Sequence, residues 1–212
     1  MIHRKMKLKR GFAMQMQEPA SGGSTRKTLA IIGTLIVTWF LTAFAGLASA
    51  HDKDETFIYA AVEGDLKKVE AFLNEGANVN AKGKESNRTA LMWASLRGHL
   101  DVVRLLLEKG ADINARDDNG ETALLSASGK GGLDVVRLLL EKGADINARD
   151  NNGRSALMTP SWIGQLEVVR LLLEKGIDVN ASDKTGRTAL MWASEQGHTQ
   201  IAELLRSYGA TR

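Results

Sequence analysis

An 18-residue string occurs twice without change, and it limits the folds open to this chain. Residues 100–117 and residues 133–150 both read LDVVRLLLEKGADINARD, and a looser copy, LEVVRLLLEKGIDVNASD, begins at Leu166. The copies lie 33 residues apart. Similarity at a fixed period of about 20–50 residues is typical of repeat arrays, in which each unit buries its apolar face against its neighbours. The chain is therefore predicted to form a solenoid.

A short T-A-L motif recurs with the same spacing. It begins at Thr89, Thr122 and Thr188, with Ser155 as a variant, and a glycine follows nine residues later, at Gly98, Gly131, Gly197 and Gly164 respectively. The Thr or Ser side chain can cap a helix N-terminus, and the glycine can end that helix in a left-handed conformation. A second helix is predicted from the helical spacing of Val102, Val103, Leu106 and Leu107, and Gly110 ends it. The polar stretch over residues 114–121 has the composition of a tight turn.

Turn, helix, loop and helix in 33 residues resemble the ankyrin repeat. Gly98-His99, Gly197-His198 and the G-A-D-I-N string at residues 110–114 match that family, whereas its T-P-L-H box is T-A-L-M or T-A-L-L here. The family's box Pro and His are therefore absent, and with them a His hydrogen bond. The resemblance implies an all-α solenoid of about five helix-loop-helix repeats joined by turn or hairpin loops. The repeats are predicted near residues 51–82, 83–115, 116–148, 149–181 and 182–212.

Polar substitutions at both ends of the array predict capping repeats. Lys68 stands where the internal repeats have Val102, and Arg206 stands where they have Leu107. An end repeat turns its outer side to water, so a charge suits those positions.

Residues 1–50 are predicted to be a leader and residues 51–212 the repeat domain. A basic segment precedes a 19-residue run without charge, Leu29–Leu47, and the small residues Ala48-Ser49-Ala50 follow. This order is typical of a secretory signal, although the run is also long enough for an uncleaved membrane anchor. Both alternatives export the remainder, to the periplasm or beyond. Met1, Met14 and Met16 are alternative starts.

Charge argues against a nucleic-acid partner. The first 50 residues hold seven of the 28 Lys and Arg and one of the 25 acids, which leaves 21 basic and 24 acidic residues, or −3, in the predicted repeat domain. No basic stripe remains there to neutralise phosphates. The chain has no Cys, so it tolerates an oxidising compartment without forming disulfide bonds.

No residue pattern indicates catalysis, a cofactor or a metal site. His99 and His198 are predicted to be satisfied locally at helix starts, and His51 has no second nearby His for a copper site. The Asp and Asn clusters at residues 112–120 lack the acid spacing of a calcium loop and are interpreted as turns. We therefore expect no enzyme activity, no cofactor, no membrane contact beyond the leader and a monomeric state.

The resemblance implies binding of a protein partner on a concave surface formed by turn tips and first helices. Repeat copies within the chain differ at specific positions, and ten of these are predicted to contact the partner: Arg97, Lys130, Asn151, Asn152, Arg154, Thr159, Trp162, Ile163, Arg187 and Gln196. The alternative is a structural or assembly role that supports another envelope enzyme. The partner's identity does not follow from the sequence.

The fourth repeat departs from the others in its first helix. Pro160 replaces an Ala of the other copies, and Trp162 and Ile163 follow it. Counted from a cap at Ser155, Pro160 lies past the first turn, which predicts a kinked or shortened helix. Trp93 and Trp192 are interpreted as packing between repeats. Trp162 is predicted to be exposed, either to fill the gap beside Pro160 or to anchor a partner.

Overall fold

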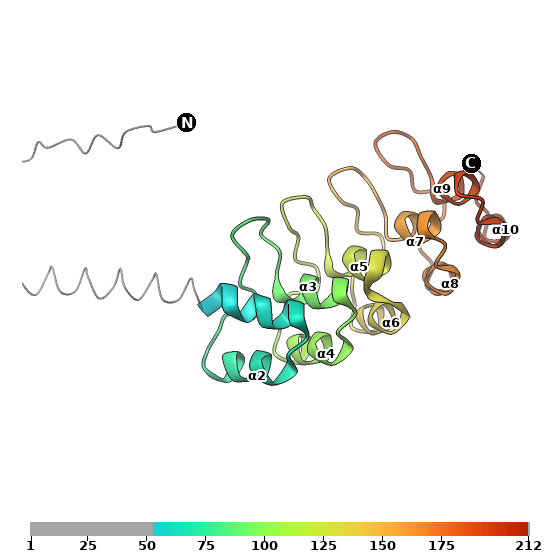
Figure 1. Cartoon of the computed structure of the whole chain (residues 1–212). Helices are drawn as coiled ribbons and strands as arrows, with labels where there is room; N and C mark the ends of the chain where they lie inside the picture. The colour runs from blue at the N-terminus through green and yellow to red at the C-terminus, as the bar shows by residue number, and fades with distance from the viewer. Residues whose placement is uncertain (1–52, 212) are drawn as a thin grey trace, which may run out of the picture. The chain divides into compact units, whose positions relative to one another are not determined.

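Short helices alternate with polar loops throughout the residues that the computed structural model describes, 53–211 (Figure 1). The helices pair as residues 53–63 with α2 (Leu66–Asn74), α3 (Ala90–Arg97) with α4 (Leu100–Glu108), α5 (Ala123–Ser126) and the π-helix η1 (Ala127–Gly131) with α6 (Leu133–Glu141), α7 (Met158–Ile163) with α8 (Leu166–Glu174), and α9 (Ala189–Glu195) with α10 (Thr199–Ser207). Within residues 53–211 there is no strand, only isolated antiparallel bridges that close loops, such as Arg149 with Ser155. The predicted all-α repeat architecture is confirmed.

The predicted leader, residues 1–50, and His51 lie outside the described residues. No helix within residues 53–211 is long and apolar enough to span a membrane.

Each helix pair stacks on the next in the order of the sequence. First helices contact first helices, as α3 does α5 and α7 does α9, and second helices contact second helices, as α4 does α6 and α6 does α8. The loops all project from the same side of this stack (Figure 1). We call the surface made by the first helices and the adjoining loops the first-helix face.

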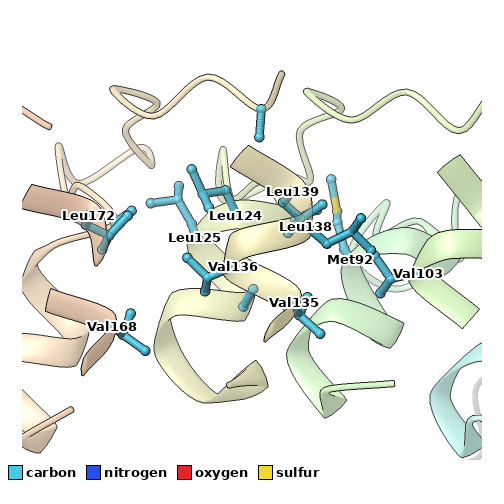
Figure 2. Packing of buried hydrophobic residues seen from close by; sticks show 14 of the residues in the cluster. Met92, Val103, Leu124, Leu125, Val135, Val136, Leu138, Leu139, Val168 and Leu172 are labelled. Atoms are coloured by element: carbon cyan, nitrogen blue, oxygen red, sulfur yellow. The ribbon is translucent and has the colours of Figure 1, made fainter. Parts of the chain in front are cut away.

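The identical strings supply the core between the stacked pairs. Leu106, Leu139 and Leu172 take the same place in successive second helices and have no exposed surface. The buried side chains of successive repeats, among them Val103, Leu139 and Leu172, belong to one continuous cluster (Figure 2). Burial of each such side chain contributes about 1.5–3 kcal/mol, so repetition of the string repeats the main stabilising contact.

Polar side chains of the loops also follow the period. Asn80, Asn114, Asn147 and Asn180 each accept a hydrogen bond from a backbone N–H of the next repeat, at 2.8, 2.9, 3.2 and 3.0 Å. Asp117, Asp150 and Asp183 each accept two backbone N–H groups of their own turn. The Asp and Asn clusters therefore build turns, as predicted. Within residues 53–211 no cluster of acids and histidines could hold a metal ion.

Three of the four predicted helix caps are present. Thr89, Thr122 and Thr188 accept hydrogen bonds from backbone N–H groups of their helices at 3.3–3.4 Å. The cap predicted at Ser155 is wrong, because its Oγ is buried without a hydrogen-bond partner and α7 begins only at Met158. The helix does end at Gly131, as the π-helix η1. The left-handed conformation predicted for Gly131 is wrong, because the positive φ, 88°, is at Gly132.

The two G-H histidines bind the preceding repeat. His99 Nε2 lies 3.0 Å from the carbonyl oxygen of Val62, and His198 Nε2 lies 3.0 Å from that of Trp162. These rings sit directly against Gly64 and Gly164, where an added Cβ would come within 2.6 and 2.8 Å of them. Glycine is therefore required at those two positions both for its positive φ and for space.

Gly164→Ala is expected to lower the free energy of unfolding by about 2–3 kcal/mol. An L side chain in the left-handed conformation costs about 1–2 kcal/mol, and displacement of His198 removes a hydrogen bond worth about 1 kcal/mol. Gly176→Ala is the matched control, since Gly176 has a φ of 82° but nothing within 4 Å of an added Cβ. Urea unfolding of both variants measures the difference. Equal losses would mean that the His198 contact adds nothing.

Both capping charges are exposed, as predicted. Lys68 pairs with Asp65 at 2.9 Å at the N-terminal end of the described range, and Arg206 is exposed in α10. Met191 and Tyr208 of the last repeat are exposed as well, whereas Met92 and Met158, which occupy the Met191 position of earlier repeats, are buried.

Arg206→Leu is expected to promote self-association while the free energy of unfolding stays within about 0.5 kcal/mol. The change places an apolar side chain on the exposed end of the array. Arg137→Leu, on an exposed position of the internal helix α6, serves as the control. Sedimentation velocity over a concentration series measures the association. A strongly destabilised monomer would show that Arg206 is buried and that the capping interpretation is wrong.

Candidate protein-binding site

Two positions in the second to fifth repeats carry the distinctive side chains of the first-helix face. The residue before the T-A-L box is Arg88, Glu121, Arg154 or Arg187, and the residue four places after the Thr or Ser of the box is Trp93, Ser126, Thr159 or Trp192. We call these the arginine position and the tryptophan position. Where both residues are present they stack: the Arg88 guanidinium carbon lies 5.0 Å from the Trp93 ring centroid, and that of Arg187 lies 4.0 Å from Trp192.

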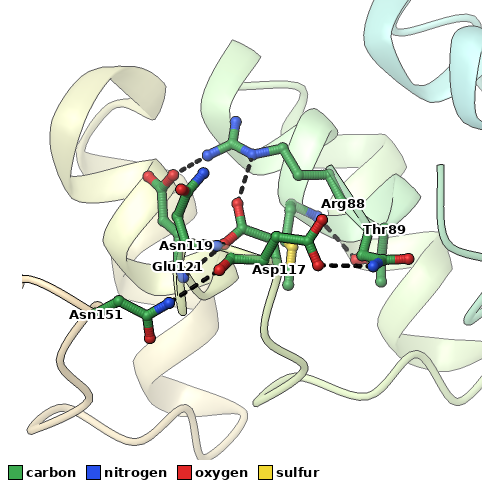
Figure 3. A network of polar contacts seen from close by, with 9 residues as sticks. Arg88, Thr89, Asp117, Asn119, Glu121 and Asn151 are labelled. Carbon is green, nitrogen blue, oxygen red and sulfur yellow. Dashed lines mark hydrogen bonds and ion pairs between the residues drawn. The ribbon is translucent and has the colours of Figure 1, made fainter. Parts of the chain in front are cut away.

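Arg88 is satisfied by the next repeat. Its guanidinium donates to Asp117 Oδ2 at 3.0 Å and to Glu121, which occupies the arginine position of the third repeat (Figure 3). The Arg88 side chain is 12% exposed and that of Asp117 is fully buried. This ion pair joins the second and third repeats and leaves little of Arg88 free for a partner.

Arg187 is satisfied within its own repeat. One guanidinium nitrogen lies 2.6 Å from each carboxylate oxygen of Glu195, and this pair holds the guanidinium over Trp192. Glu195 is in the last turn of α9, at the position that Trp162 occupies in α7.

Arg154 makes neither kind of ion pair. By the Arg88 pattern its acids would be at positions 183 and 187: Asp183 is present but makes no ion pair with Arg154, and position 187 is Arg187. By the Arg187 pattern its acid would be at position 162, which is Trp162. Within residues 53–211 its side chain makes no hydrogen bond or ion pair, and it is exposed. A guanidinium with five donors in a planar fork is therefore open to solvent on the first-helix face.

The charge of Arg154 acts on the carboxylate of Asp183. Burial acts to raise the Asp183 pKa, but bonds from the Thr185 hydroxyl and from the backbone N–H groups of Arg187 and Thr185, with the Arg154 charge, hold this pKa below its ordinary value. Its stabilising contribution is therefore present at neutral pH and is lost as the pH falls through the folded-state pKa. Asp183 Oδ1 is occupied by the turn.

A pocket of about 230 Å³ opens beside Arg154. Its walls are Arg154, Met158, Thr159, Trp162 and Trp192, from the fourth and fifth repeats. The two indoles meet edge to face, with ring centroids 6.4 Å apart. Trp162 is 48% exposed and its neighbour Ile163 is 40% exposed, so large apolar surface faces water here.

α7 begins late, at Met158, and its residues Met158, Thr159 and Trp162 form one wall of this pocket. Because the helix begins at Met158, Pro160 lies in its first turn, where a missing N–H costs little. The predicted shortening is confirmed, whereas the predicted position of Pro160 past the first turn is wrong. His198 then binds the Trp162 carbonyl oxygen, so the fifth repeat fixes the backbone that carries the indole.

The structure brings together four of the ten predicted contact residues. Arg154, Thr159 and Trp162 line the pocket, and Arg187 joins them through Trp192. Arg97, Lys130, Ile163 and Gln196 are exposed at one position, just before the glycine of each repeat, and line no part of the pocket. Asn151 and Asn152 are exposed in a loop but bind neighbouring loops, to Asp118 and Asn119 and to Lys184 respectively.

Two pocket residues were not among the predicted contacts. Trp192, which the sequence indicates as packing between repeats, does contact the core, and together with Met158 it also lines the pocket. The sequence does carry a signal for Trp192. The string RTALMWAS occurs at both 88–95 and 187–194, so Arg187 and Trp192 form the same stacked pair as Arg88 and Trp93, but with a different acid partner.

Comparison with known proteins agrees with the repeat architecture. The family model of ankyrin repeats in three copies matches residues 29–117, 112–183 and 150–211, while no curated protein matches the chain. Ankyrin repeats generally act as non-catalytic modules for protein–protein interaction. With most of the chain matched and the helix pairs in place, the protein belongs to the ankyrin repeat family.

Proposed function

We propose that this chain is an exported module that binds a protein partner through its first-helix face and loop tips. The observation that carries the proposal is the open pocket between α7 and α9, with the half-exposed Trp162 on its wall. Trp and Arg are enriched among the residues that dominate interface energetics. Exposed apolar surface of this kind on a monomer is typical of interaction sites.

The rigidity of the pocket supports the same proposal. The Trp162 backbone is held by His198, its ring packs on Trp192, and Trp192 is stacked under Arg187. A side chain that is already fixed loses little conformational entropy on binding, so more of its contact energy appears as affinity.

Export is proposed from the leader alone. The basic segment, the apolar run and the small residues at 48–50 are those of a secretory signal, and an anchor in the inner membrane facing the periplasm is the alternative. Cell fractionation and N-terminal sequencing test it. We expect a chain that begins at His51 outside the cytoplasm, whereas a soluble cytoplasmic chain with an intact leader would contradict export.

Site-specific photo-crosslinking in intact cells tests partner binding at this face. A photoreactive amino acid replaces Ile163 beside the pocket and, as the control, Arg137 on the exposed side of α6. We expect one discrete protein adduct from position 163 and none from position 137. Equal adducts from both positions, or none from position 163, would contradict binding through the first-helix face.

A further inference from the structure

We propose that the pocket binds an acidic residue and a neighbouring bulky apolar side chain from an extended segment of the partner protein. This inference rests on the proposed function and adds the chemistry of the partner. It follows from three features of the fourth and fifth repeats: the unpaired Arg154, the two indoles, and the size of the space between them.

The first feature is the charge of Arg154. Of the three arginines in the arginine position, Arg88 and Arg187 form ion pairs with carboxylates within the chain. Arg154 has Asp183 in the place of Asp117, without an ion pair between them, and it has Arg187 and Trp162 in the places of Glu121 and Glu195. Guanidinium groups form their strongest contacts with carboxylates, by two parallel N–H···O bonds. Asp183 Oδ1 is held by its own turn, so a partner carboxylate would supply the ion pair that Arg154 lacks within residues 53–211.

The second feature is the apolar wall. Trp162, Trp192 and Met158 line the space beside the guanidinium with two indoles and a flexible thioether. These groups favour an aromatic or long aliphatic side chain rather than a second polar group. Carboxylate and apolar side chain would therefore enter the pocket together.

The third feature is its size. A space of about 230 Å³ is smaller than the roughly 300–1,000 Å³ of most small-molecule sites. It has room for one large side chain, with the acid at its rim, but not for the face of a helix. Because extended chain rises about 3.3 Å per residue, an acid that reaches Arg154 lies within about two residues of the apolar side chain.

Peptide selection tests the predicted chemistry. The full chain, as purified, is presented with a random 12-residue peptide library in parallel with its Arg154→Gln and Arg137→Gln variants. We expect the peptides enriched by the wild type to place Asp or Glu within two residues of Trp, Phe, Leu, Ile or Met. The Arg154→Gln variant should lose the acid preference but keep the apolar one, and Arg137→Gln should keep both. Failure to enrich any peptide would overturn the inference.

A double-mutant cycle then assigns the contact to Arg154. The most enriched peptide and its Gln counterpart are titrated against the wild type and each variant. We expect Arg154→Gln to weaken the acidic peptide at least tenfold and the Gln peptide less than twofold, because charged hydrogen bonds are the stronger ones. An acid preference that survives Arg154→Gln would overturn the inference. Loss of peptide binding with Trp162→Ala but no acid preference would overturn it and leave the proposed function standing.

Discussion

Arg88→Ala is expected to lower the free energy of unfolding by about 3 kcal/mol. The change removes the cation that faces the fully buried Asp117 carboxylate and the partly buried Glu121 (Figure 3). Removal of one partner of a buried ion pair costs about 3–5 kcal/mol, since the remaining charge is left without compensation. The lower end applies because Asp117 keeps two backbone N–H donors at 2.8 Å. Urea or thermal unfolding measures the loss.

Arg187→Ala is the matched control for this prediction. Arg187 occupies the same position of the last repeat and also stacks on a Trp, but its acid partner Glu195 is 45% exposed. Exposed pairs of this kind contribute about 0–1 kcal/mol. A loss at Arg88 no greater than the loss at Arg187 would show that burial of Asp117 gives the ion pair no special weight.

Trp162→Ala is expected to weaken partner binding by at least about 2 kcal/mol, or roughly thirtyfold, because a rigid Trp at the centre of an interface contributes most of its energy. The free energy of unfolding should fall by less than about 1.5 kcal/mol, since the side chain is half exposed and only partly packed on Trp192. Titration calorimetry with the partner and urea unfolding separate the two effects.

Tyr208→Ala controls for the loss of exposed aromatic surface, because Tyr208 is 45% exposed but lies in the last repeat outside the pocket lining. It should leave affinity unchanged. If Trp162→Ala destabilises the fold strongly while affinity is retained, Trp162 only fills the space beside Pro160.

Repeated residues made the fold predictable. The Thr caps and the second-helix leucines recur with the same period, and each takes the same structural place in every copy. The predictions of local structure are wrong where the sequence of one repeat differs from that of the other repeats. Ser155 resembles the other caps in sequence, but α7 begins only at Met158, so that Pro160 lies in its first turn. Gly132, next to Gly131, gave the backbone a second place to turn.

The candidate site was only partly predictable for the same reason. Variation among copies identified Arg154, Thr159 and Trp162, which do lie together. It also identified Asn151 and Asn152, which bind neighbouring loops through side-chain and backbone groups. Variation shows which positions are free of the repeat's own packing, but not which of them are taken by contacts between loops. The open guanidinium of Arg154 could not be predicted, because the ion pairs of Arg88 and Arg187 depend on how the repeats pack.

Nuclear magnetic resonance of the tryptophan indole N–H groups tests the central claim most directly. The described residues contain three indoles, Trp93, Trp162 and Trp192, and single Trp→Phe variants assign their signals. On titration with the partner or a selected acidic peptide, the signals of Trp162 and Trp192 should shift together while that of Trp93 stays in place. Saturable binding that shifts Trp93, or that leaves both Trp162 and Trp192 unmoved, would contradict binding at this pocket.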